Sequence, residues 1–307
     1  MEQLMRNFFL FLSNNKALTK AAKKYGFRFG ASRFVAGVNI HEAAKKIKEL
    51  NEKGFVITVD HLGEFIDNET EARQSAQECI RAIQVIAHQQ LNAELSLKLT
   101  SLGMDISYEL VMENMRNIMQ TAKEHQVIVT LDMEDYGRLE QTLDIFTTLK
   151  QEFDNVGTVL QAYLYRVEKD LEALNKYKPY LRLVKGAYKE SEEVAFPNKA
   201  DVDKNYKKII KQNLLYGNYT AIATHDDEII EYTKELEQTY HLSRDQFEFQ
   251  MLYGIRNDLQ DRLLKEGYKV RIYLPYGEDW FGYNMRRLAE RPANVMFVLR
   301  GVLKKSK

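Results

Sequence analysis

Eight short apolar runs alternate with helical patterns along this 307-residue chain, and this alternation restricts its fold more than any other feature. Short apolar or β-branched runs are typical of buried strands, and strands separated by helices predict a parallel sheet. Eight such units predict an α/β protein whose sheet closes into a (β/α)8, or TIM, barrel. The predicted strands are residues 55–59, 95–99, 127–131, 156–160, 181–184, 219–223, 247–252 and 270–274.

The domain organisation follows from the lack of any internal boundary signal in the sequence. There is no linker rich in proline, glycine or serine, no low-complexity tract and no close repeat. One domain preceded by N-terminal helices accounts for this most simply. We expect residues 1–50 to form the helical segment and residues 51–307 to form the catalytic barrel.

Composition excludes several classes of function. The 44 basic side chains balance the 44 acidic ones, so net charge does not favour nucleic-acid binding. Cys79 is the only cysteine, which excludes an intramolecular disulfide, and the six histidines lack the spacing of a catalytic metal site. The apolar run at residues 8–12 is too short to span a membrane and poorly shaped as a signal peptide. These features predict a cytoplasmic protein without a metal.

Polar side chains gather at the carboxyl ends of the predicted strands, where a barrel forms its active site. Lys98 and Arg182 each stand between two leucines, so they point into the barrel mouth or are exposed on the wrong face. A buried cation needs an anion, which a carboxylate substrate or a flavin would supply. The residues at these ends are Asp60, His61, Lys98, Asp132, Gln161, Arg182, Lys185, Thr224, His225, Gln250 and Tyr273.

A polar helix face is predicted near the C-terminus. Tyr283, Arg286, Arg287 and Glu290 stand at positions i, i+3, i+4 and i+7, which places them on one face. Two guanidinium groups and a phenol on one face are suited to binding a small carboxylate.

This helix and several earlier segments resemble the proline dehydrogenase family, flavoenzymes that oxidise L-proline to pyrroline-5-carboxylate. The family motifs occur in order over roughly residues 55 to 295, which is more specific than any single motif. The resemblance implies a distorted (β/α)8 barrel that binds FAD. The matching segments are residues 97–99, 131–134, 161–163, 182–188 and 223–225.

The resemblance also implies roles for individual residues. Asp132 and Arg182 are expected at the catalytic centre, where Arg182 would lie beside the flavin and Asp132 would orient Lys98 or another cation. Glu290 is expected to fix the rotamer of Arg286, and Tyr188 to support the site. The expected substrate-binding residues are Lys98, Tyr273, Tyr283, Arg286 and Arg287. The expected FAD-binding residues are Met133, Gln161, Arg182, Lys185, Gly186, Ala187, Thr224 and His225.

Partners are likewise expectations from the family. Its members reoxidise their flavin with a membrane quinone, so peripheral contact with the inner face of the cell membrane is a hypothesis for this chain. We expect the product to pass to a separate pyrroline-5-carboxylate dehydrogenase, because the sequence leaves no room for that second enzyme.

Two other functions stay open on the residues alone. A Schiff-base lyase on the same barrel would use Lys98 or Lys185 as an amine nucleophile. A non-catalytic barrel that binds amino acids would keep the carboxylate site without any cofactor. Asp60 and His61 receive no assignment, because they could assist catalysis, cap the next helix or close the barrel mouth.

Overall fold

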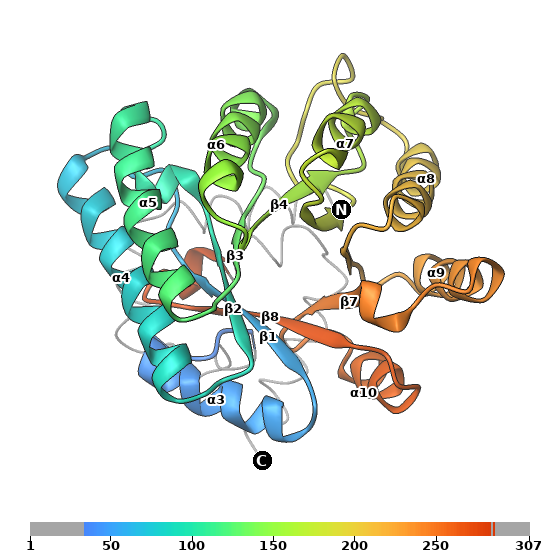
Figure 1. Cartoon of the computed structure of the whole chain (residues 1–307), viewed down its shortest axis with the longest axis horizontal. Coiled ribbons are helices and arrows are strands. Elements are labelled where there is room, and N and C mark those ends of the chain that lie inside the picture. Colours follow the sequence, from blue (N-terminus) through green and yellow to red (C-terminus); the bar gives the residue numbers. More distant parts are fainter. Residues whose placement is uncertain (1–33, 284, 286–307) are drawn as a thin grey trace.

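A closed barrel of eight parallel strands forms the centre of the computed structural model, which describes residues 34–283 and 285 (Figure 1). The strands pair in chain order, and β8 pairs with β1 to close the barrel. The predicted (β/α)8 barrel is therefore confirmed. Its strands are β1 (Val56–His61), β2 (Ala93–Leu97), β3 (Val129–Leu131), β4 (Val156–Gln161), β5 (Tyr180–Val184), β6 (Thr220–Ala223), β7 (Phe247–Leu252) and β8 (Val270–Tyr276).

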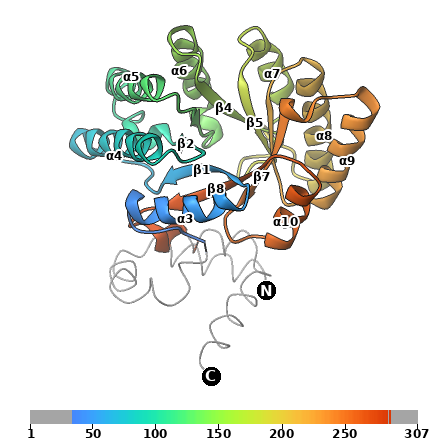
Figure 2. The same cartoon turned by 60° about the horizontal axis from the view of Figure 1, so that its bottom comes forward.

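Helices surround the barrel on its outer face (Figure 1, Figure 2). Several begin where a side chain accepts a hydrogen bond from a free backbone N–H group, as Asn68 does from Glu71 and Ser107 from Leu110. Short 3-10 turns, η3 (Leu99–Leu102), η4 (Tyr136–Arg138) and η5 (Arg244–Gln246), lie in the connections. The helices are α3 (Ile40–Glu52), α4 (Glu69–His88), α5 (Tyr108–Glu124), α6 (Leu139–Glu152), α7 (Val167–Asn175), α8 (Lys199–Leu215), α9 (Asp227–Tyr240) and α10 (Asn257–Lys265).

Helix α3 lies at the end of the predicted N-terminal helical segment and packs against β1. The first 33 residues of that segment, including the apolar run at 8–12, lie outside the described residues. Between residues 34 and 283, no helix combines the length and the apolar character that a membrane crossing requires.

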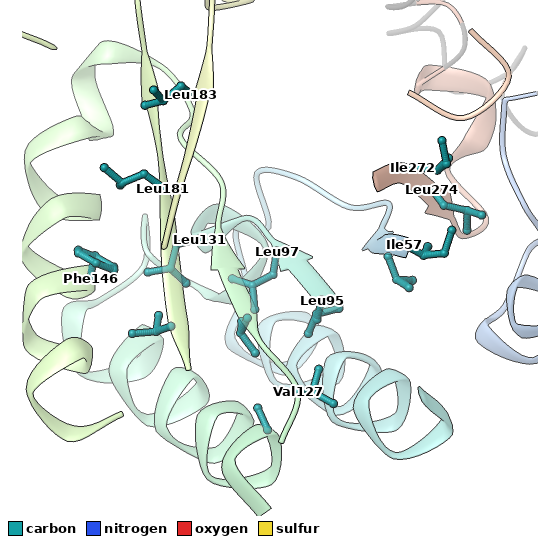
Figure 3. Packing of buried hydrophobic residues seen from close by; sticks show 14 of the residues in the cluster. Ile57, Leu95, Leu97, Val127, Leu131, Phe146, Leu181, Leu183, Ile272 and Leu274 are labelled. Atoms are coloured by element: carbon teal, nitrogen blue, oxygen red, sulfur yellow. The ribbon is translucent and has the colours of Figure 1, made fainter. Parts of the chain in front are cut away.

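The apolar core lies between the barrel and its helices. Residues alternate along each strand, so that Leu181 and Leu183 face outward while Arg182 faces into the barrel. Figure 3 shows Leu131, Leu181 and Phe146 of α6 in this outer layer. Full burial of each such side chain is worth about 1.5–3 kcal/mol relative to its exposure.

The inside of the barrel is polar, whereas barrels of this kind usually hold layers of branched apolar residues. Arg271 Nε donates to Glu248 Oε1 at 2.5 Å, and its Nη1 lies 3.3 Å from Glu94 Oε2. The Tyr180 hydroxyl donates to Glu248 Oε1 at 2.9 Å. These buried contacts connect β2, β5, β7 and β8 across the barrel axis.

Gly157 lies inside β4, although a glycine in a strand usually weakens it. A Cβ atom at this position would lie 2.7 Å from Cδ1 and 2.9 Å from the carbonyl oxygen of Tyr180 on β5. The glycine therefore gives Tyr180 the space to reach Glu248.

Strand ends differ from the prediction where polar residues or proline extend a strand. β8 continues through Pro275 to Tyr276, and β1 continues to His61, because Pro275 pairs with Asp60 and Tyr276 pairs with His61. β2 ends at Leu97, earlier than predicted, because Leu99 begins a 3-10 turn. This turn places Lys98 just beyond the strand end.

The buried ion pair of Arg271 leads to a stability prediction. We expect Arg271→Met to lower the free energy of unfolding by about 3–5 kcal/mol, because it leaves Glu248 buried without its cation and removes one of the two cations near Glu94. Urea denaturation at neutral pH measures this change. Arg116→Met is the matched control, because Arg116 pairs with Glu152 on the surface and its loss should cost less than about 1 kcal/mol. Equal losses in the two variants would contradict the prediction.

Candidate active site

Five polar side chains from five strands meet at the barrel mouth, which is formed by the carboxyl ends of the strands. Arg182 comes from β5 and Tyr273 from β8, while Asp60 is the penultimate residue of β1. Lys98 and Asp132 directly follow β2 and β3. The structure therefore brings together Lys98, Asp132, Arg182 and Tyr273, which the sequence predicts for the site, and adds Asp60.

Asp132 accepts hydrogen bonds from four neighbours, one of which is Lys98. Arg182 Nη1 lies 2.5 Å and Ser96 Oγ 2.7 Å from Asp132 Oδ1, while the Tyr273 hydroxyl donates to Oδ2 at 2.8 Å. Burial opposes its ionisation, but Arg182 and Lys98 outweigh burial and hold the pKa of Asp132 below its usual value. Asp132 therefore stays a carboxylate that fixes the positions of its donors.

Arg182 is only 4% exposed and lies between several groups. Its guanidinium carbon lies 5.1 Å from the centre of the Tyr273 ring, and its Nη2 lies 3.9 Å from Glu94 Oε1. Burial disfavours the charge, but Asp132 raises the pKa of Arg182 above its usual value. The site thus contains a permanent buried cation.

Lys98 shares its charge among several carboxylates. Its Nζ lies 3.4 Å from both oxygens of Asp60, 3.5 Å from Asp132 Oδ2 and 4.0 Å from Glu64 Oε1. Burial lowers the pKa of Lys98, but these anions raise it well above its usual value. Lys98 is therefore protonated, whereas a Schiff-base nucleophile must be a neutral amine.

Asp60 is a site residue that the sequence leaves unassigned. Its side chain is 2% exposed, and burial raises its pKa to about 6 even though Lys98 favours the charged form. One signal could have identified it. Between Val56 and Asp60, side chains alternate, so Thr58 and Asp60 share the face opposite Ile57 and Val59. If the apolar pair faces the helices, the side chains of Thr58 and Asp60 both point into the barrel.

The rim beyond β5 holds Lys185, Gly186 and Ala187. The Lys185 ammonium binds Asp203 and lies 2.7 Å from Asp226 Oδ2, so two carboxylates already balance the cation predicted for a pyrophosphate. Gly186 has a φ of 109°, and a Cβ there would lie 2.3 Å from the Tyr163 ring. Only glycine fits this position, while Ala187 is exposed.

The other predicted cofactor residues lie along the same rim. Met133 is buried, and the Thr224 hydroxyl accepts a hydrogen bond from the Asp226 backbone N–H at 3.1 Å. His225 Nε2 accepts from the Leu252 backbone N–H at 3.0 Å. When neutral, the His225 ring must therefore carry its proton on Nδ1.

Buried polar atoms on β4 and β5 provide a test of whether a flavin fits. Gln161 Oε1, Arg182 Nε and Arg182 Nη2 are buried and make no hydrogen bond within the described part of the chain. Native structures rarely leave such atoms unsatisfied. An acceptor at the end of β4 and two donors on the neighbouring strand β5 match the N–H and carbonyl groups of a flavin ring, so these residues fit FAD.

The remaining predicted residues lie near the C-terminus and beyond β5. Tyr188 is half-buried, and burial raises the pKa of its hydroxyl above its usual value. Tyr283 is buried in an apolar cluster with Val35, Leu62 and Trp280. Arg286, Arg287 and Glu290 lie outside the described residues.

Glu134 is a further buried carboxyl near the mouth. It accepts hydrogen bonds from the Thr100 backbone N–H at 3.1 Å and from the Thr100 hydroxyl at 2.6 Å. That hydroxyl in turn accepts from the Phe65 backbone N–H, so Glu134 holds the loop between β1 and α4. Burial raises the pKa of Glu134 to about 7.

Comparisons with known proteins agree on one family. A sequence profile of the family described as "Proline dehydrogenase" matches residues 43–300. The chain is 58% identical to proline dehydrogenase 1 of Bacillus subtilis (strain 168) over 98% of its own length and 100% of that protein. It is 43% identical to the proline dehydrogenase of Deinococcus radiodurans over 99% of both chains. The fold matches the crystal structure of proline utilization A (PutA) from Bdellovibrio bacteriovorus inactivated by N-propargylglycine. That match has a TM-score of 0.82 and 25% identity, and it covers 93% of this chain and 36% of that one.

The raised pKa of Glu134 predicts how stability depends on pH. Between its ordinary value of 4.5 and about 7, the folded protein keeps a proton that the unfolded chain releases. The wild type should therefore lose up to about 3 kcal/mol relative to Glu134→Gln as the pH rises through this range. Denaturant unfolding of both proteins at several pH values measures the difference. A difference that does not change with pH would contradict the prediction.

Proposed function

This chain belongs to the proline dehydrogenase family, and we propose that it oxidises L-proline to 1-pyrroline-5-carboxylate in the breakdown of proline to glutamate. The observation that supports this most directly is the buried cluster at the mouth. Two protonated cations, Lys98 and Arg182, flank the Asp132 carboxylate beside the Tyr273 ring. Such a cluster suits a small ring that bears a carboxylate and an amine.

The proposed cofactor is FAD, which when bound would accept a hydride from the proline carbon next to nitrogen. Gln161 and Arg182 would hold the flavin ring through their buried polar atoms that have no hydrogen bond in the described chain. Thr224 and His225 would contact it from the end of β6, where the Leu252 N–H orients the His225 ring. Other contacts would come from Met133, Lys185, Gly186 and Ala187.

The proposed task of the substrate-binding residues is orientation. Hydride transfer requires the donor carbon to be held about 3–3.5 Å from its acceptor. Lys98 would attract the proline carboxylate, and Tyr273 would limit the space around the ring, its hydroxyl anchored on Asp132. The C-terminal helix would add Tyr283, Arg286 and Arg287, with Glu290 fixing Arg286.

Arg182 is the proposed electrostatic catalyst. Oxidation of proline adds negative charge to its acceptor, and a cation already held in place lowers the energy of that charge without reorganisation. The 2.5 Å contact with Asp132 holds the guanidinium in position before substrate binds. Nε and Nη2 would remain available to hydrogen-bond the reduced cofactor.

The electrons are proposed to pass to a quinone, with the enzyme peripheral to the inner face of the cell membrane. The pyrroline product would pass to a separate pyrroline-5-carboxylate dehydrogenase. Reduction of a soluble quinone analogue in the presence of proline tests the acceptor, and the absence of such reduction would remove the basis for membrane contact.

The two rival functions have less support. A lyase would need Lys98 or Lys185 as a neutral amine, whereas Lys98 is surrounded by carboxylates that keep it protonated and Lys185 is paired with two aspartates. Borohydride trapping of a carbonyl substrate would separate this rival from the proposal. An amino-acid-binding barrel would show no flavin spectrum.

The visible spectrum of the purified protein, before and after anaerobic addition of L-proline, tests the proposed reaction. We expect an oxidised flavin spectrum that bleaches on addition of proline. A flavin that does not bleach would contradict the assignment of proline as substrate. A protein that binds no flavin even after addition of FAD would contradict the assignment of FAD as cofactor.

Removal of the Arg182 cation should slow the chemical step. We expect Arg182→Met to reduce the rate of flavin reduction by proline about 100- to 1,000-fold, the usual effect of losing one group that stabilises developing charge. Stopped-flow measurement at saturating proline tests this, with FAD content and thermal unfolding as checks on folding. Arg116→Met, a surface change, should retain the wild-type rate. A reduction rate for Arg182→Met close to that of the wild type would contradict the role.

A further inference from the structure

The ammonium of Lys98 hydrogen-bonds the carboxylates of both Asp60 and Asp132. Nζ is 3.4 Å from each Asp60 oxygen and 3.5 Å from Asp132 Oδ2. All three side chains are at most 13% exposed, so water screens these charges only weakly. A substrate carboxylate on Lys98 would therefore be a third anion around one cation.

The two aspartates differ in what else stabilises their charge. Asp132 has Arg182 at 2.5 Å, Ser96 at 2.7 Å and the Tyr273 hydroxyl at 2.8 Å in addition to Lys98. The Tyr273 phenol has a single proton, which it donates to Asp132, so it cannot serve both carboxylates fully. Asp60, by contrast, accepts hydrogen bonds from one cation within the described chain, which is Lys98.

We propose that Asp60 is a positioning residue that takes up one proton from solvent when a substrate carboxylate binds Lys98. This inference rests on the proposed function, because it takes proline as the source of that carboxylate. Lys98 keeps its own proton and turns its charge toward the substrate, while the Asp60 carboxylate becomes a neutral acid. The charge of the cluster thus stays constant on binding, which avoids a buried excess anion.

The surroundings of Asp60 support this assignment. Lys98 faces it from the end of β2, Asp132 from β3, Tyr273 from β8 and Glu64 from the loop after β1. On its outer side, Cys79 and Tyr276 stay neutral, because burial raises the pKa of each above its usual value. Burial raises the pKa of Asp60 to about 6, close enough to neutrality for one added anion to complete its protonation.

The test is a binding measurement on the FAD-loaded protein with cyclopentanecarboxylate. This probe has the ring and carboxylate of proline but no amine, so it brings no proton of its own. Calorimetry in two buffers of different ionisation enthalpy, between about pH 7 and about pH 8, gives the number of protons bound per probe. We expect one proton per site, with Kd rising tenfold per pH unit in this range.

Two variants identify the group that takes the proton. Asp60→Asn should bind the probe with no proton uptake and with a Kd that does not change with pH, while Asp60→Glu should restore the uptake. Glu134→Gln is the matched control, because Glu134 is the other buried carboxyl at the mouth with a pKa near neutrality, yet it is bound by Thr100. Its removal should leave proton uptake unchanged.

Each result either supports or overturns the inference. Absence of proton uptake by the wild type, uptake that persists in Asp60→Asn, or uptake that disappears in Glu134→Gln would overturn it. A probe that does not bind where proline bleaches the flavin would also overturn it. If the probe causes proton uptake but proline does not bleach the flavin, the proposed reaction is contradicted and the inference about Asp60 stands. Failure of the proposed reaction and failure of the inference are therefore distinguishable.

Discussion

Compensation of buried charge is the constraint on which the rest of this structure depends. The barrel encloses Glu94, Glu248 and Arg271 in its lower part and Asp132 and Arg182 at its mouth, where each charge needs a partner within a few ångströms. The apolar layer around the barrel supplies stability, while the enclosed ion pairs determine which strands can stand opposite each other. The cations of the candidate site are therefore part of the same polar interior that lines the barrel.

The apolar runs were sufficient to predict the eight strands, because every strand buries an apolar outer face against a helix. Strand ends were harder to predict: Pro275 pairs with Asp60 and Tyr276 with His61, and this pairing extends β8 and β1 in a way that no local pattern reveals. The polar interior was also not predicted. Glu248 and Arg271 lie in runs that read as ordinary strands, and their contact depends on closure of the barrel.

The candidate site shows the same division between local pattern and long-range contact. Lys98 and Arg182 were identifiable because a lone cation between two leucines must be compensated. The partners of Lys185 were not, because Asp203 lies in the next helix, α8, and Asp226 lies beyond the next strand, β6, so both approach Lys185 only in the folded barrel. The inward position of Asp60 could be predicted from the alternation in its strand. Its role could not, because that role depends on the distance between Asp60 and the Lys98 ammonium in the folded barrel.

The polar interior also has a consequence for how such an enzyme can be altered. Arg182 contacts Asp132 at the mouth and lies 3.9 Å from Glu94, which in turn meets Arg271 deeper in the barrel. Residues that share partners in this way do not respond independently to substitution, so the effects of changes at the two levels will not add. Redesign of the pocket for another amino acid must therefore treat mouth and interior as one unit, with compensating changes made together.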